Sequence, residues 1–210
     1  MRYAIIQRGE SRSFPQGDPF LAGAVAIEVA DVVVHLGAPL VTDPGRAAVL
    51  IELATECLGV HTGEARGEEG SNVLGFARYR NGADPPSPLL ELVRQPRTLD
   101  SAVANARAVF EAAGLTVVVC SDQAGRIVDR LVRPKYNAAL RLLDEGLASA
   151  RDMDLTCRLG LGYPDGPIER VERGGLAYHH EVSAALFEAY GTAAYAPARR
   201  AAVAAARRRT

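Results

Sequence analysis

The pattern of apolar residues changes once along the chain, after Ser121. Before that point, short apolar runs alternate with stretches of helical spacing. After it, only helical spacing remains. Continuous valine runs such as Val32–Val34 and Val117–Val119 are typical of strands buried on both faces of a parallel sheet. A chain of 210 residues has room for one ordinary domain or two small ones. The sequence therefore predicts an α/β domain over residues 1–122 and an all-α domain over residues 123–210.

Individual elements follow from run length, spacing and the residues that end them. A helix is expected from Asp43-Pro44 to Ala54, because Asp suits the N-cap and Pro the first helical position. A loop is expected over 63–72. The apolar face of the first helix after Ser121 is expected to comprise Ile127, Leu131, Ala138 and Leu142. Strands are predicted at 3–6, 32–34, 58–62, 73–79, 89–93 and 117–120, and further helices at 100–113, 149–160, 168–190 and 197–208.

Composition and charge exclude several functional classes. The net charge of −1 lacks the basic excess of a nucleic-acid binder. No apolar run is long enough to span a bilayer, so no membrane partner is expected. The three cysteines, Cys57, Cys120 and Cys157, form no CxxC pair, which argues against a zinc site and favours the cytoplasm. Lys135 is the only lysine among 24 basic residues, as GC-rich arginine codons would explain.

A series of motifs in fixed order runs through residues 117–169. In order they are the strand before Asp122, Gly125-Arg126-Ile127-Val128, Arg130-Leu131 with Pro134 and Asn137-Ala138-Ala139-Leu140, Glu145-Gly146-Leu147-Ala148-Ser149 before Asp152-Met153-Asp154, and Leu159-Gly160-Leu161-Gly162-Tyr163-Pro164-Asp165-Gly166-Pro167. This series resembles the L-3-hydroxyacyl-CoA dehydrogenase family, where its Rossmann domain passes into its helical domain. The likeness is close over 117–190 and looser over 30–116, where Ala30–Val34 and Leu89–Val93 match two strands of the family.

The resemblance implies a fold, a reaction and a partner. The fold is a Rossmann-like parallel sheet domain followed by a helical domain that pairs two subunits. The reaction is NAD-dependent oxidation of a 3-hydroxyacyl-CoA to a 3-ketoacyl-CoA, with a histidine as base and a glutamate that orients it. Small residues such as Ala138, Ala139, Ala184 and Ala185 suit a homodimer contact, and equally an internal core. An acyl-CoA is the expected ligand.

The cofactor site is where the sequence departs from the family. A dinucleotide needs a glycine-rich turn after the first strand, because only glycine lets the backbone approach the pyrophosphate closely. The segment Arg8–Ser13 contains no G-x-G-x-x-G. About 30 residues precede the strand at Val32, roughly one βαβ unit. We therefore expect a truncated Rossmann-like domain in which NAD binding is doubtful.

The catalytic positions are also altered. The family's histidine corresponds to Ala77 when the alignment is anchored on Gly75, and to Arg78 when it is anchored on Asn81. Neither side chain can accept a proton. The resemblance assigns Glu91 as the orienting glutamate and Asp129 to the asparagine that contacts substrate. Asn137 is a second substrate-binding candidate.

Three hypotheses follow. In the first, the chain is an active dehydrogenase. In the second, it is a degenerate member that acts as a dimerising or acyl-CoA-binding module. In the third, it is an enzyme that uses another base. His35 and His61 are the candidates for that base, because His35 follows one predicted strand and His61 lies near the end of the next. A histidine at a strand end is more often structural. The loss of three family features favours the degenerate member.

Overall fold

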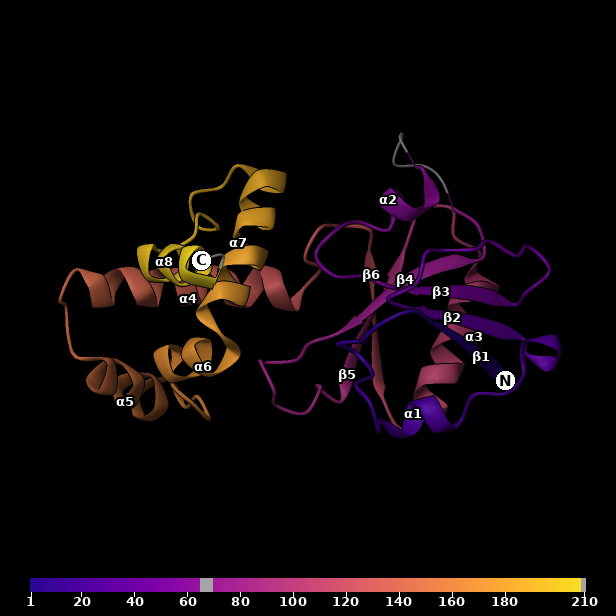
Figure 1. Cartoon of the computed structure of the whole chain (residues 1–210), viewed down its shortest axis with the longest axis horizontal. Coiled ribbons are helices and arrows are strands. Elements are labelled where there is room, and N and C mark those ends of the chain that lie inside the picture. The colour runs from indigo at the N-terminus through magenta and orange to yellow at the C-terminus, as the bar shows by residue number, and fades with distance from the viewer. Residues whose placement is uncertain (65–69, 209–210) are drawn as a thin grey trace. The chain divides into compact units, whose positions relative to one another are not determined.

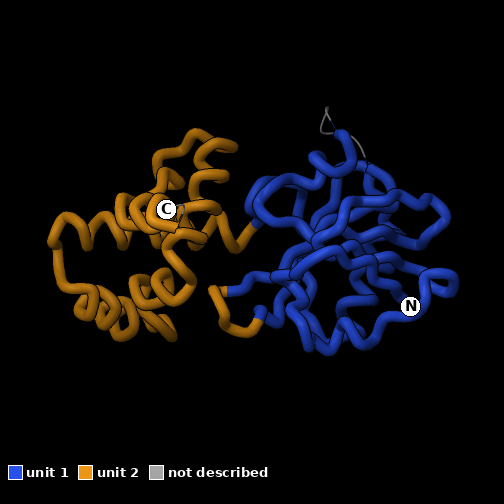
Figure 2. The backbone as a smooth tube through the Cα atoms, viewed as in Figure 1, with its two compact units in different colours: residues 1–80, 86–126 blue, residues 81–85, 127–210 orange. Residues whose placement is uncertain are grey.

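The computed structural model describes residues 1–64 and 70–208. It divides into two compact units (Figure 2). Unit 1 comprises residues 1–80 and 86–126, and unit 2 comprises residues 81–85 and 127–210. Part of the predicted loop over 63–72 lies outside the described residues.

Unit 1 is built on a six-stranded sheet whose strands lie side by side in the order of the sequence (Figure 1). All neighbouring strands are parallel except β4 and β5, which are antiparallel. This confirms the predicted fold class, a Rossmann-like α/β unit followed by a helical one. The strands are β1 (Tyr3–Gln7), β2 (Val32–Leu36), β3 (Ala48–Glu52), β4 (Val73–Arg78), β5 (Leu89–Arg94) and β6 (Thr116–Ser121).

Alternate residues of these strands face two separate cores. One face packs against α3 (Asp100–Ala112), whose Ala102, Ala106 and Phe110 are buried. Phe14 and Phe20 join this core, and Phe20 belongs to the short helix α1 (Pro19–Ala22). A 3₁₀ turn, η1 (Ile27–Val29), then leads into β2.

The opposite face of the sheet is covered by the connection from β3 to β4. Leu53 and Leu58 of this connection pack on Val49, Ile51 and other side chains of that face. The connection contains the short helix α2 (Gly59–Thr62). The carboxylate of Asp122, just after β6, accepts hydrogen bonds from Leu58 N at 2.6 Å and Gly59 N at 2.8 Å. This carboxylate fixes the start of α2 against the end of β6.

Two predicted elements were wrong. The helix expected from Asp43 to Ala54 is instead a turn followed by strand β3, and the Asp43 carboxylate closes the turn by accepting from Gly45 N. The run Ala48–Ile51 is buried between β2 and β4, and a continuous apolar run does not distinguish helix from strand. The strand expected at 58–62 is helix α2, because Asp122 caps it from far along the chain.

Unit 2 contains five helices among its described residues. They are α4 (Val128–Asp144), α5 (Ala150–Leu161), α6 (Pro167–Gly174), α7 (Leu176–Tyr190) and α8 (Arg199–Arg208). The helix predicted over 168–190 is therefore two helices, which break where Gly175 adopts a φ of +88°. The predicted apolar face of α4 was also wrong. Ile127, Leu131 and Leu142 are exposed, whereas Tyr136 and Leu140 carry the core contact.

The joint between α5 and α6 depends on one carboxylate. Asp154 of α5 accepts hydrogen bonds from Ile168 N at 2.8 Å and Glu169 N at 3.0 Å. It thus satisfies the first turn of α6, whose N-cap residue Gly166 has no side chain to do so. A Cβ atom at Gly166 would lie 2.2 Å from the Asp154 side chain. Glycine is required here because the capping carboxylate fills that space.

A buried polar network joins α4, α7 and the residues before α8. Nε2 of His179 donates to Oδ1 of Asn137 at 2.9 Å, and Nδ1 of His179 accepts from Arg133 at 3.4 Å. These partners require a neutral imidazole with its proton on Nε2. Burial, and next the charge of Arg133, lower the pKa of His179 to about 3. The network is therefore built around a neutral histidine.

We expect Gly166→Ala to destabilise unit 2 by about 2 kcal/mol or more, because the new methyl group displaces the Asp154 cap. Chemical denaturation measures this loss. Gly160→Ala in α5 is the matched control, since the nearest atom to its added Cβ lies at 4.0 Å. That variant should be neutral or up to about 1 kcal/mol more stable. Equal effects of the two substitutions would contradict the proposed steric cause.

Stability should fall as the pH is lowered from about 6.5, because the unfolded chain then binds a proton at residue 179 that the folded chain does not bind until about pH 3. One such proton contributes a slope of about 1.4 kcal/mol per pH unit. Denaturation midpoints from pH 7 to 5 should therefore decrease less steeply in His179→Gln than in the wild type. Parallel pH profiles would show that His179 does not remain neutral.

Candidate functional site

The strands β4 and β5 bring two of the predicted site positions together. In their antiparallel register Ala77 lies directly opposite Glu91, and Arg78 lies opposite Leu90. Side chains of directly opposed residues share one face of a sheet. The position beside the Glu91 carboxylate is therefore occupied by Ala77 and not by Arg78. Both residues are largely buried, with Glu91 4% and Ala77 8% exposed.

Arg78 points to the other face and has a structural task. Its Nε donates to Ser87 O at 2.9 Å, and its Nη1 donates to Ser13 O and Asp18 Oδ2, both at 2.9 Å. The guanidinium carbon lies 5.1 Å from the centroid of the Phe14 ring. The guanidinium therefore ties the N-terminal segment to the end of β4.

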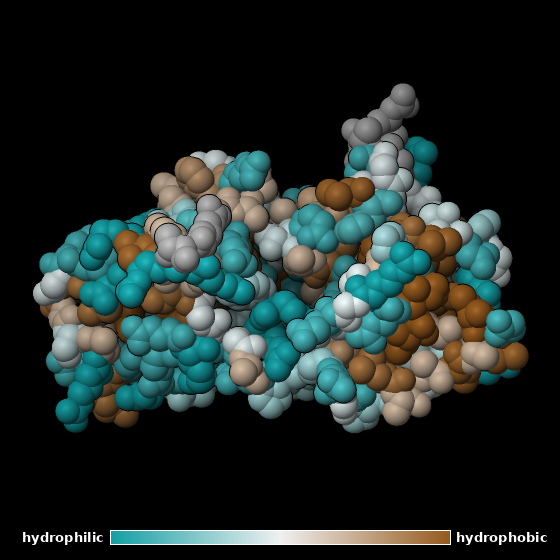
Figure 3. Space-filling view, in the orientation of Figure 1, coloured by the Kyte–Doolittle hydropathy of each residue, from teal (hydrophilic) through white to brown (hydrophobic). Residues whose placement is uncertain are grey.

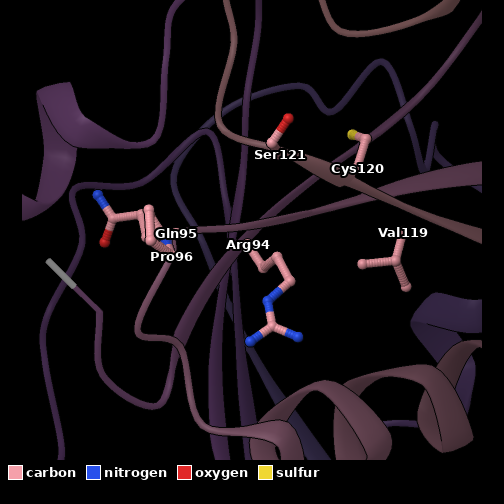
Figure 4. A pocket seen from close by; sticks show the side chains of 6 residues that line it. All are labelled: Arg94, Gln95, Pro96, Val119, Cys120 and Ser121. Carbon is pink, nitrogen blue, oxygen red and sulfur yellow. The ribbon is translucent and has the colours of Figure 1, made fainter. Parts of the chain in front are cut away.

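A pocket of about 260 Å³ lies at the ends of β5 and β6 (Figure 4). It is lined by Arg94, Gln95, Pro96, Val119, Cys120 and Ser121. Arg94 and Cys120 extend in opposite directions from their strands, and the Cys120 sulfur faces the same side of the sheet as Glu91. Burial, and next the charge of Glu91, raise the pKa of the Cys120 thiol to about 11. A thiol with so high a pKa is a poor nucleophile at neutral pH.

The connection that follows β3 holds a histidine–glutamate pair. His61 Nε2 lies 3.0 Å from Glu56 Oε1, and both side chains are about 30% exposed. Burial opposes ionisation of Glu56, but hydrogen bonds from His61 and from the backbone N–H groups of Glu56 and Ala54 outweigh it and lower its pKa. The pair thus combines an ionised carboxylate with an oriented, accessible imidazole. Sequence reasoning identified His61 but missed Glu56, which lies five residues earlier on the loop.

Arg126 anchors this loop from the far end of unit 1. Its guanidinium donates to Ala54 O and, at 3.4 Å, to Glu56 O. Gly125 N donates to Thr55 O at 2.8 Å. Arg126 adopts a φ of +48°, unusual for a residue with a side chain. The resemblance marked this residue only as part of a motif, whereas the structure shows it as the contact that orders the loop.

His35, the other candidate base, is fully buried in β2. Neither ring nitrogen meets hydrogen-bond geometry with a described residue. Burial lowers the pKa of His35, against a smaller opposite effect of the nearby backbone of Pro39 and Val41. Its imidazole therefore has no exposed surface with which to reach a substrate.

In unit 2, Asp129 and Asn137 both have partners within the unit. The Asp129 carboxylate pairs with the Arg133 guanidinium one turn later, at 2.8 Å. Asn137 is fully buried, and its amide donates to Ser183 Oγ and to the carbonyls of Ala194 and Tyr195. Its oxygen accepts from His179. Asn137 thus connects helices in this structure, and its side chain offers no surface to a ligand.

Residues 9–14, which we call the crossing segment, run along the edge of the sheet where β2, β3 and β4 end. Ser13 N donates to Glu52 Oε1 at 2.7 Å at the end of β3. At the end of β4, Arg78 N donates to Ser13 Oγ at 3.1 Å, and Arg12 donates to Arg80 O at 2.8 Å. In open α/β sheets this edge is where ligands bind. Here the chain itself lies across it.

These residues do not fit a dinucleotide. The Rossmann site lies where the order of strands reverses, next to the first strand. In the described part of unit 1 the strands run in sequence order from β1 to β6, with no reversal. The segment after β1 carries a single glycine before Ser11, namely Gly9. A pocket of about 530 Å³ remains beside β1, lined by residues that include Gln7, Glu10 and Arg80.

Across residues 1–64 and 70–208, no three His, Cys, Asp or Glu side chains are grouped so that they could hold a metal ion. No helix within these ranges has the length and apolar character needed to cross a membrane.

Comparison with known proteins finds similarity to 3-hydroxyacyl-CoA dehydrogenases. Residues 125–209 match the family model for the C-terminal domain of 3-hydroxyacyl-CoA dehydrogenase. A 3-hydroxybutyryl-CoA dehydrogenase of Mycobacterium tuberculosis is 31% identical over 159 residues, which are 75% of this chain and 54% of that protein. A probable 3-hydroxyacyl-CoA dehydrogenase of Caenorhabditis elegans is 41% identical over 92 residues, which are 44% of this chain and 30% of that protein.

The fold agrees with solved structures of such enzymes. An Escherichia coli 3-hydroxybutyryl-CoA dehydrogenase superposes with a TM-score of 0.73 at 22% identity, over 86% of this chain and 40% of that one. The Ralstonia eutropha (S)-3-hydroxybutyryl-CoA dehydrogenase gives 0.72 at 21% identity, over 86% and 67%. The chain spans about half or less of the length of the curated relatives described above. Residues 125–209 belong to the 3-hydroxyacyl-CoA dehydrogenase family, as the C-terminal domain of that family.

Proposed function

We propose that the protein is a degenerate member of its family that does not transfer hydride and that serves as a dimerising or acyl-CoA-binding module. The observation that carries this proposal is the register that puts Ala77 opposite Glu91. The family's reaction needs a proton acceptor beside that glutamate, and a methyl group cannot accept a proton. The three free cysteines of the protein suit a reducing compartment, and we propose the cytoplasm as its location.

Unit 1 supports the loss of NAD binding. Hydrogen bonds join the crossing segment to the ends of β3 and β4, and Arg8, just before it, donates to Leu36 O at the end of β2. A dinucleotide at this edge would therefore have to displace the segment. Within it, Ser13 is 2% exposed and Ser11 3% exposed. Removing such groups from their partners leaves buried polar atoms unsatisfied, at about 1–3 kcal/mol each.

Unit 2 supports association with a second copy. Several large apolar side chains of α4, α5 and the loops that follow these helices are exposed. In Figure 3 the broadest apolar area lies over unit 1, and unit 2 shows smaller apolar patches among hydrophilic residues. Exposed fractions reach 70% for Leu131, 79% for Leu159 and 63% for Leu161. Large apolar side chains left exposed on one unit favour an interaction site there. We propose a homodimer formed through these helices.

A second candidate function rests on the Glu56–His61 pair. A histidine held by a carboxylate is the arrangement that a general base requires. In this alternative the protein is an active 3-hydroxyacyl-CoA oxidoreductase with His61 as its base, and Glu91 has no role in proton transfer. His35 is a weaker choice, because it is fully buried.

We expect that the protein does not oxidise NADH when acetoacetyl-CoA is added, because unit 1 has no proton acceptor opposite Glu91 and the crossing segment covers the edge of the sheet. The absorbance of the nicotinamide band measures this reaction. Calorimetry with CoA and with NADH then distinguishes an acyl-CoA module from a purely dimerising one. Measurable turnover would overturn the proposal. Turnover that falls about a hundredfold or more in His61→Gln, and not in His35→Gln, would establish the second candidate.

We expect two copies per particle at micromolar concentration in light scattering. Leu159→Glu should weaken the dimer about tenfold or more, since it buries a charge at the apolar contact. Val41→Glu is the matched control, because Val41 is 64% exposed but belongs to unit 1. A monomeric wild type, or equal weakening by both substitutions, would contradict a dimer through unit 2.

A further inference from the structure

Helix α8 carries arginines on the face that is turned away from the core of unit 2. Ala201 and Ala205 are buried, whereas Arg199, Val203 and Arg207, which follow one another at intervals of one turn, are exposed. A pocket of about 330 Å³ opens on this face, beside the first residue of α7. It is lined by Leu176, Arg199, Arg200, Val203, Ala204 and Arg207. Every charged residue in the wall of this pocket is thus an arginine.

Asp144 positions two of these arginines and leaves their terminal nitrogen atoms to other partners. Its Oδ1 accepts from Nε of Arg200 at 2.6 Å, and its Oδ2 lies 3.6 Å from Nε of Arg199. Within residues 1–64 and 70–208, no group accepts a hydrogen bond from the Nη atoms of either arginine. Both guanidinium groups therefore keep N–H donors for an anion. One carboxylate between two guanidinium groups also leaves an excess of positive charge.

The pocket has a cation at each end and apolar side chains between them. Arg200 and Arg207 lie two turns apart on α8, which is about 10 Å along the helix axis. Val203 and Ala204 lie between them, and Leu176 contributes from α7. Guanidinium groups bind phosphate oxygens through paired N–H groups, and apolar walls favour the rest of a ligand. The ligand that fits carries a phosphate group towards each end of a less polar body.

We propose that this pocket binds a nucleoside bisphosphate, the group that forms the anionic end of coenzyme A. One phosphate position lies at the Arg199–Arg200 pair and the other at Arg207. The ribose and base lie against Val203 and Ala204. The choice of coenzyme A as the source of this group rests on the proposed acyl-CoA-binding function. The charge and spacing of the arginines require only the bisphosphate.

Isothermal titration calorimetry on the full chain tests the site. Adenosine 3′,5′-bisphosphate and coenzyme A should both bind, and adenosine should not. Dephospho-coenzyme A, which lacks the 3′-phosphate, should bind about tenfold more weakly than coenzyme A, as the loss of one charge-assisted contact predicts. Added salt should weaken both bisphosphate ligands, because these exposed charges are screened. Failure of adenosine 3′,5′-bisphosphate to bind would overturn the proposal.

Substitutions at the two ends of the pocket test its position. Arg199→Gln and Arg207→Gln should each weaken the binding of adenosine 3′,5′-bisphosphate about tenfold. Both side chains are exposed, and a melting curve shows whether each variant is folded. Arg151→Gln is the matched control, since Arg151 is exposed on α5 and should not affect binding. Equal affinities in the wild type and all three variants would place the ligand elsewhere and overturn the proposal.

These measurements separate the pocket from the proposed function. Coenzyme A that binds the wild type and both pocket variants equally well would support an acyl-CoA module and overturn the site on α8. Binding of the free bisphosphate without binding of coenzyme A would support the site, with a free nucleotide as its occupant. Oxidation of NADH would overturn the degenerate function and leave the site intact, because all residues of the pocket belong to unit 2.

Discussion

The ion pair between Arg78 and Asp18 holds the N-terminal part of unit 1 in place. Both side chains are largely buried, 8% and 13% exposed, and the same guanidinium also binds Ser13 and Ser87 through their carbonyls. Removing one partner of a buried pair leaves the other charge uncompensated, which costs about 3–5 kcal/mol. The position of Phe14 in the core and the path of the crossing segment both depend on this contact. Arg78, one of the two residues that the resemblance puts at the position of the family's histidine, thus stabilises the fold.

The two units have diverged from the family to different extents. Unit 2 keeps the motifs of the C-terminal domain, and the structure gives a physical reason for one of them. Asp154 and Gly166 must occur together, because the carboxylate caps α6 through the space that a larger residue at 166 would occupy. In unit 1, residues 9–14 lie across the edge of the sheet at which open α/β sheets bind ligands.

Much of the fold could be predicted from the sequence, because buried parallel strands and glycine-terminated helices leave local patterns. The β3 strand and helix α2 could not, since burial between two strands and a cap by Asp122 are set by distant residues. Residues 75–81 contain no histidine, but the sequence could not decide which of Ala77 and Arg78 lies opposite Glu91; that needed the register. The Glu56–His61 pair and the network around His179 join side chains through loops and helices whose geometry no spacing reveals.

The agreement between strand order and sequence order has a consequence for how unit 1 assembles. Each strand from β2 to β6 pairs with the strand made just before it, so the sheet can grow at one edge as the chain leaves the ribosome. In a complete doubly wound sheet the first strand lies in the interior and must wait for partners on both sides. Shorter sequence separation between paired strands lowers the entropic cost of each pairing and speeds folding. Unit 1 is thus suited to vectorial folding during synthesis, ahead of the helices of unit 2.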